Sequence, residues 1–311
     1  MRTAFPATLV RIFARFAALM FLASVLIFLL LRAVPGDPAR IALGVSATEE
    51  AIAEMAAKLG TDRPLAVQYF DWMGGLLSGN FGISMASATD ITPQVIERAG
   101  VSLTLTLLAM AMTMLIAVPL GVFLAAREGT TSAGVLAAVT QLGIVVPSFL
   151  VGILGVAVFS VRLGWLPANG WGSPAHLVLP VSALALVQAA ILTRYVRRAM
   201  LEEMSKDYVR TARARGASTS EVLYGRALKN AALPVLTVMG LQLSSLIVGA
   251  VVIERVFTIP GLGTMLLTAV GNRDLTTIQT VMMLLVAFTL IINTLVDLTY
   301  AVIDPRVRRS A

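Results

Sequence analysis

The residue types that usually perform enzymatic chemistry are scarce in this chain. It has no cysteine and one histidine, His176, so a cluster of histidine or cysteine metal ligands cannot be built, and any Ser-His-Asp triad would depend on His176 alone. A loop that cradles nucleotide phosphates ends in Gly-Lys-Ser/Thr, yet none of the three lysines, Lys58, Lys206 and Lys229, follows a glycine. We therefore predict that the chain is not an enzyme and holds no metal or cofactor of its own.

Neutral polar side chains occur inside several long apolar stretches. Such groups either form hydrogen bonds between helices or line a path for a polar solute. A peptide carries its own backbone donors and acceptors, so it can cross a neutral path without a fixed charge. The six candidate path residues are Gln141, Ser148, Gln188, Gln242, Ser245 and Asn293. Packing between helices is the alternative for each of them.

The segment 194–230 is strongly basic, with nine basic against four acidic residues. Its sequence predicts two helices joined by a tight turn. Ser205 is the candidate N-cap of the first helix, and Gly216 supplies a left-handed stop. Ser218 then opens a capping box for a second helix that runs toward Pro234. Composition alone favours a basic helix held by anionic lipid, and docking on a partner protein is the alternative.

These residues lie among apolar stretches that are long enough to cross a membrane. The chain is 58% hydrophobic and 13% charged, whereas soluble domains carry about a quarter charged residues. A spanning helix needs roughly 20 apolar residues. We predict an all-α integral membrane protein with about six spans, at 16–31 (extended by 10–14), 99–126, 133–161, 177–192, 231–253 and within 275–303. A cleaved signal peptide is the alternative for the first span, although its apolar core is long for that role.

Charge predicts the orientation and the division of the chain. Segment 32–98 carries five basic and eight acidic residues, and the other connecting segments are neutral or basic. The positive-inside rule therefore places both termini in the cytoplasm. We divide the chain into 1–31 (a cytoplasmic stretch and the first span), 32–98 (periplasmic) and 99–311 (the remaining spans, with the loop 194–230). The basic residues flank apolar runs, so membrane lipid is an expected partner and nucleic acid is not.

The outer segment 32–98 is predicted to be ordered. Ser46 fits the start of a capping box for a helix near 48–59, with Gly60 as its stop, and Pro64 can begin a second helix. The segment either packs on the spans as a cap or contacts a docking protein.

An ordered set of motifs covers nearly the whole chain. Residues 207–216 read Asp-Tyr-Val-Arg-Thr-Ala-Arg-Ala-Arg-Gly, and 226–236 read Arg-Ala-Leu-Lys-Asn-Ala-Ala-Leu-Pro-Val-Leu. Further motifs lie at 34–38, 59–65, 79–82, 146–149, 254–263 and 304–306. Together they closely resemble the permeases of peptide/nickel-type ABC importers, and the first of the two permease subunits in dipeptide, oligopeptide and nickel systems. Sugar importers have Glu-Ala-Ala where this chain has Arg210, Thr211 and Ala212.

The resemblance implies a type I ABC importer permease fold in the bacterial inner membrane. It also implies that the basic loop holds a coupling helix that docks on an ATPase. The implied coupling residues are Tyr208, Arg210, Thr211, Ala212, Arg213 and Gly216. Implied partners are a second homologous permease subunit, two ATPase subunits or domains that bind ATP and Mg, and an extracytoplasmic substrate-binding protein.

The function that follows is half of an alternating-access path for di- or oligopeptides. Within the same family, import of a nickel chelate or another small solute is the alternative. A secondary transporter or channel is the rival from another class. It would move solute without ATPase partners, and the scarcity of ionisable residues inside the spans disfavours it.

Overall fold

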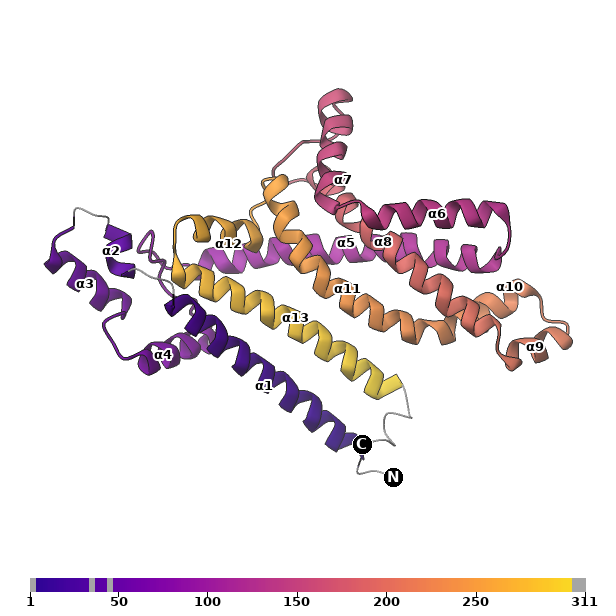
Figure 1. Cartoon of the computed structure of the whole chain (residues 1–311), viewed down its shortest axis with the longest axis horizontal. Helices are drawn as coiled ribbons and strands as arrows, with labels where there is room; N and C mark the ends of the chain where they lie inside the picture. The colour runs from indigo at the N-terminus through magenta and orange to yellow at the C-terminus, as the bar shows by residue number, and fades with distance from the viewer. Residues whose placement is uncertain (1–3, 34–36, 44–46, 304–311) are drawn as a thin grey trace. The chain divides into compact units, whose positions relative to one another are not determined.

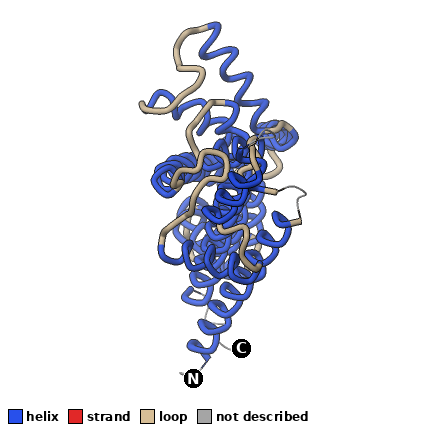
Figure 2. Tube along the Cα trace, turned by 90° about the vertical axis from the view of Figure 1, so that its left-hand side faces the viewer, coloured by secondary structure: helices blue, strands red, loops and turns tan. Residues whose placement is uncertain are grey.

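A computed structural model describes residues 4–33, 37–43 and 47–303 of the chain, which are almost entirely helical (Figures 1 and 2). The helices are α1 (Ala4–Arg32), α2 (Pro38–Leu43), α3 (Glu49–Leu59), α4 (Leu65–Ser78), α5 (Thr92–Ala126), α6 (Thr131–Val145), α7 (Ser148–Gly155), η1 (Val156–Arg162), α8 (Pro174–Met204), α9 (Asp207–Ala214), α10 (Thr219–Val222), η2 (Leu223–Ala227), α11 (Leu228–Val256), α12 (Leu262–Gly271) and α13 (Leu275–Ile303). Within the described ranges, β pairing is confined to one isolated bridge between Ile83 and Asp90. Ser46, the motif at 304–306 and residues 34–36 of the motif at 34–38 lie outside the described residues.

Five helical stretches are long and apolar enough to span a membrane, and a bent pair brings the number to six. The five are Ala7–Arg32, Thr92–Ala126, Pro174–Met204, Thr219–Val256 and Leu275–Val302. They confirm five of the six predicted spans, with longer helices than the apolar cores suggested. The α8 helix has 31 residues, or about 46 Å at 1.5 Å per residue, so it extends well past a hydrocarbon layer of roughly 30 Å.

The predicted third span differs from the structure, because it is not one straight helix. Its two halves, α6 and the pair α7–η1, meet at an angle of 98°. Pro147 causes the break, since it lacks an N–H and its ring forces the preceding residue into extended backbone. Val146 accordingly has φ −80° and ψ 121°, and the first half ends at Val145.

The chain forms two compact units, which we describe separately. The first consists of Met1–Ser102 with Pro260–Thr294, and the second of Leu103–Ile259 with Leu295–Ala311. The predicted division at residues 31 and 98 stays a prediction.

In the first unit the described residues of the segment after α1 are ordered, as predicted. The α3 helix ends at Gly60, which has the expected left-handed φ of 67°. Its N-cap is Thr48, whose hydroxyl accepts the Ala51 N–H at 3.3 Å, and this corrects the assignment to Ser46. The α4 helix follows Pro64 as predicted.

Asp274 fastens the 82–91 turn to the start of α13 within the first unit. Its carboxylate accepts the Ser84 hydroxyl at 2.5 Å and the Met85 N–H at 2.9 Å. It also accepts the Thr277 hydroxyl at 2.7 Å, so this nearly buried acid caps α13 and holds a distant segment together.

The second unit is built on close contact between helices. Leu192, Val196 and Met200 of α8 are fully buried in a core shared with α5 and α11. Gly240 of α11 lies against Val296 of α13, where an added Cβ would come within 2.3 Å of a Val296 methyl. Small residues of this kind let membrane helices approach each other closely.

Candidate functional site

The α9 helix follows α8 after a single break in the second unit. Ser205 is the C-cap of α8 and keeps near-helical backbone (φ −83°, ψ −12°). Lys206 is extended (φ −73°, ψ 153°) and is the N-cap of α9, without a side-chain cap bond. The prediction of Ser205 as N-cap was therefore wrong by one residue. The first part of the predicted loop, residues 194–204, belongs to α8.

The turn after α9 confirms the predicted stop. Gly216 has φ 87°, a left-handed conformation that carries a steric cost for residues with a Cβ. The Gly216 N–H donates to the Arg213 carbonyl at 2.9 Å, and the Ala217 N–H donates to the Ala212 carbonyl at 3.1 Å. These two bonds complete a Schellman motif, so the direction of the chain after α9 is fixed.

The second helix starts at the predicted cap. The Ser218 hydroxyl accepts the Glu221 N–H at 3.2 Å. From Thr219 the helix continues through the short π segment η2 and past Pro234 to Val256. One continuous helix therefore joins the turn after α9 to a membrane span. The sequence predicted these as a helix that runs toward Pro234 and a span at 231–253.

The inner face of this helix-turn-helix is apolar. Val209 and Val222 are fully buried, and Ala212 is only 3% exposed in the same cluster. The Ala212 methyl group therefore packs between α9 and α10, and its coupling role stays a prediction. Its place in the structure is that of a support for the candidate contact face.

A polar network ties α9 to the end of α8. Glu203, which is 8% exposed, pairs with the ammonium of Lys206 and accepts the Tyr208 hydroxyl at 2.8 Å. Burial raises the pKa of the Tyr208 phenol above its usual value, so the hydroxyl stays protonated and donates. The hydrogen bond to Glu203 raises the pKa of Lys206. Glu203 therefore holds two residues of the α9 region in place.

The outer face of α9 is basic and accessible. Arg210, Thr211 and Arg213 are all exposed. Asp207 lies 3.6 Å from the Arg210 guanidinium, with both side chains almost fully solvated, a geometry that contributes little energy. The guanidinium groups are consequently free to meet an acidic or carbonyl-rich surface.

The six candidate path residues fall into different environments. Gln242 of α11 donates through Nε2 to the Gln188 carbonyl at 3.0 Å and to Gln188 Oε1 at 3.1 Å. This pair forms a bond between helices, with Gln242 6% exposed. Gln141 and Ser245 are exposed, and Ser148 begins α7 directly after the bend. Asn293 is half-buried in the other unit.

Two structural features of the site had no clear signal in the sequence. Glu203 is one of four acids in a basic segment, and nothing in its spacing marks it as the acid that turns inward. The 98° bend at Pro147 is the second, because prolines 119, 180 and 234 lie inside helices of this same chain.

Two protein-family models match the chain. Residues 117–309 match the model of the binding-protein-dependent transport system inner membrane component, and residues 7–106 match the N-terminal model of such membrane components. The chain belongs to this family. Related proteins align with it over almost their whole length. A probable peptide ABC transporter permease of Sinorhizobium fredii is 39% identical over 299 residues, covering 94% of this chain and 96% of the relative.

Other relatives of this ABC transporter permease carry similar names. A putative peptide transport system permease of Brucella abortus is 41% identical over 298 residues, covering 93% of this chain and 95% of the relative. The glutathione transport system permease GsiC of Escherichia coli is 37% identical over 289 residues, covering 93% and 94%.

Solved structures confirm the predicted fold of the permease. An inward-facing MetNI methionine ABC transporter chain superposes with a TM-score of 0.61 at 19% identity, covering 69% of this permease and 98% of that chain. An amino acid ABC transporter chain gives 0.52 at 18% identity, covering 67% and 93%. The fold is that of a type I ABC importer permease.

Proposed function

We propose that the permease forms half of an alternating-access path for di- or oligopeptides across the bacterial inner membrane, driven by ATP hydrolysis in partner subunits. The observation that carries the proposal is the construction of the α9 region. The side chains of Arg210, Thr211 and Arg213 are exposed. The bond to Glu203 holds α9 against the end of α8, and the Schellman turn fixes the direction of the chain after α9. A helix held in this way can pass a displacement of its partner on to α8 and α11.

The partners and cofactors follow from this role. Two ATPase subunits or domains bind ATP and Mg²⁺ in this proposal. This chain has no Gly-Lys-Ser/Thr phosphate loop of its own. A second homologous permease subunit completes the path. An extracytoplasmic protein delivers the solute, in keeping with the binding-protein dependence of the family. Peptide as substrate is supported by the names of the relatives, and nickel chelates or other small solutes are the alternative.

The path itself is assigned to neutral polar groups. Gln141 and Ser245 are exposed side chains on apolar helices, which favours a role outside the packing of this chain. The bond between Gln188 and Gln242 instead favours packing for that pair. We retain Ser148 and Asn293 as candidates.

The proposed topology places both termini in the cytoplasm. The basic segment 194–230 and the acidic segment 32–98 support it through the positive-inside rule. Reporter fusions at Arg2 and Ala311 should indicate the cytoplasm, and a fusion near Glu54 should indicate the outside. An external C-terminus would contradict the six-span arrangement.

Reconstitution separates the proposal from a secondary transporter or channel. The permease is purified with the subunits that accompany it and placed in liposomes with a di- or oligopeptide. Uptake that requires ATP and the ATPase subunits supports the proposal. Uptake by the permease alone along a solute or ion gradient would instead support the rival class.

A further inference from the structure

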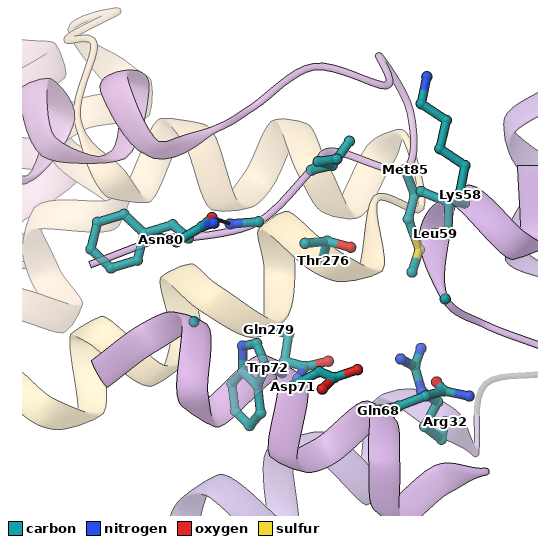
Figure 3. Close-up of a pocket in the computed structure, with 15 residues that line it drawn as sticks. Arg32, Lys58, Leu59, Gln68, Asp71, Trp72, Asn80, Met85, Thr276 and Gln279 are labelled. Atoms are coloured by element: carbon teal, nitrogen blue, oxygen red, sulfur yellow. Dashed lines mark hydrogen bonds between the residues drawn. The ribbon is translucent and has the colours of Figure 1, made fainter. Parts of the chain in front are cut away.

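A cavity of about 250 Å³ with both polar and apolar lining residues lies in the first unit, where the end of α1 meets α4 and the start of α13. Figure 3 shows its lining: Gln68, Asp71 and Trp72 project from α4, and Asn80 and Thr276 lie across from them. Arg32, the last residue of α1, also contributes to the wall. None of these residues belongs to the coupling site or to the candidate path.

Three atoms around the cavity have no hydrogen-bond partner among the described residues. They are Arg32 Nε, Trp72 Nε1 and Gln68 Oε1, and each is buried. The first two are donors and the third is an acceptor. The amide nitrogen of Gln68 is already committed to the Thr61 and Arg63 carbonyls, which fixes the acceptor atom. Buried polar atoms are almost always satisfied, so three on residues that line one cavity indicate a ligand that offers both acceptors and a donor. The Arg32 guanidinium and the Asp71 carboxylate in the same lining favour a ligand that carries both charges.

The cavity lies at the level of a membrane surface. Arg32 ends the apolar helix α1, and Ser24 lies eight residues earlier, about 12 Å deeper along the axis. The Tyr69 hydroxyl of α4 is 2.8 Å from the Ser24 hydroxyl, and the Tyr69 ring packs on Phe28 with centroids 5.4 Å apart. The α4 helix therefore lies beside the last turns of the span instead of above them.

The outward surface of α4 is suited to lipid. Val67, Phe70 and Leu77 share one side of this helix and are 41%, 70% and 84% exposed. The adjoining span α1 also exposes large apolar side chains, among them Leu29 and Leu30. An amphipathic helix with such a face lies in the membrane interface, with its apolar side against acyl chains.

We propose that this cavity binds the headgroup of an aminophospholipid of the phosphatidylethanolamine type, with its acyl chains along the exposed faces of α1 and α4. The phosphate oxygens accept the Arg32 Nε–H and the Trp72 indole N–H. The headgroup ammonium donates to Gln68 Oε1 and faces the Asp71 carboxylate, which also accepts the Arg63 guanidinium at 3.0 Å. The ligand thereby satisfies the three buried atoms and covers an apolar surface that water would otherwise meet.

The test measures the phospholipid that stays with the protein. The protein is purified from its native membrane with its accompanying subunits, washed in detergent, and its lipid is extracted and quantified by mass spectrometry. Trp72→Phe removes the indole N–H and keeps an aromatic ring beside Phe28 and Tyr69. Trp165→Phe is the matched control, because Trp165 is 69% exposed and does not line this cavity. Arg32→Gln is a second variant.

We expect phosphatidylethanolamine to be enriched over its share of the bulk membrane. Retention should fall about fivefold in Trp72→Phe and in Arg32→Gln, as for loss of a charge-assisted hydrogen bond, and stay unchanged in Trp165→Phe. Equal retention in all variants would overturn the proposal. Preference for a phospholipid without an amine would refute the ammonium contacts. Displacement of the lipid by millimolar inorganic phosphate would identify a free-anion site instead.

A photo-crosslinker tests what covers α4. The natural chain has no cysteine, so Phe70→Cys supplies a unique thiol for a benzophenone maleimide. The label should capture phospholipid. Capture of a second permease subunit would overturn the lipid assignment of this face.

Discussion

The Tyr208 hydroxyl donates to Glu203 Oε2 at 2.8 Å and thereby joins α9 to the end of α8. Glu203 also pairs with Lys206, the residue at which the chain changes direction between the two helices. An exposed docking face can transmit a displacement only if its helix is held rigidly against the neighbouring helix. In the proposed function, the exposed face of α9 binds the partner, and this bond serves the transmission of movement from α9 to α8.

Tyr208→Phe should weaken coupling while leaving docking intact. The change removes one hydrogen bond to a carboxylate, worth about 1.5 kcal/mol or more, and leaves Arg210, Thr211 and Arg213 in place. We expect the ATPase to co-purify at the normal ratio while uptake per ATP hydrolysed falls severalfold. Tyr224→Phe is the control, because Tyr224 is 62% exposed. Unchanged transport stoichiometry in Tyr208→Phe would remove the bond from the mechanism.

Gly216 and Gly225 offer a matched pair for the turn. A Cβ would meet no atom within 4 Å at either position, and only Gly216 has a left-handed φ, 87°. Gly216→Ala should cost about 1–2 kcal/mol in backbone strain, while Gly225→Ala should be neutral or slightly stabilising because it favours helix. Uptake should fall only in Gly216→Ala, with similar amounts of both proteins in the membrane. Equal uptake by the two variants would mean that the turn is not required for coupling.

Gly240 and Val296 test the packing of α11 against α13. A Cβ on Gly240 would lie 2.3 Å from Val296 Cγ2 but 3.4 Å from Val296 Cβ. Gly240→Ala alone should overpack the contact and cost about 1–3 kcal/mol, seen as a lower thermal midpoint of the purified protein. Adding Val296→Ala removes the clashing methyl and should restore most of the loss. Additive destabilisation in the double variant would contradict this contact.

Local rules predicted the turns of the chain well. Gly60, Gly216 and Ser218 occupy the predicted cap positions, because a cap depends on a few neighbouring residues. The predicted N-caps Ser46 and Ser205 were wrong. Thr48 and Lys206, one or two residues further along the chain, are the N-caps instead. Apolar length likewise predicted the spans, since the hydrocarbon thickness sets it.

Longer-range features were beyond the sequence. The contact of Tyr69 with Ser24 joins residues 45 positions apart, and no local pattern encodes it. The inward position of Ala212 depends on Val222 from the following helix. Pro147 breaks its helix while Pro234 does not, so the presence of a proline does not by itself predict which helix bends.

Site-directed cross-linking tests the central claim, that α9 docks on an ATPase, most directly. The chain lacks cysteine, so Thr211→Cys on the exposed face of α9 and Ser132→Cys at the exposed start of α6 each provide one thiol. A short photoactivatable maleimide is attached to each variant in native membranes and the adducts are identified by mass spectrometry. We expect a major adduct between position 211 and an ATPase subunit, and little or none from position 132. Adducts of position 211 with phospholipid alone would contradict this claim and would identify α9 as a basic helix that rests on the membrane.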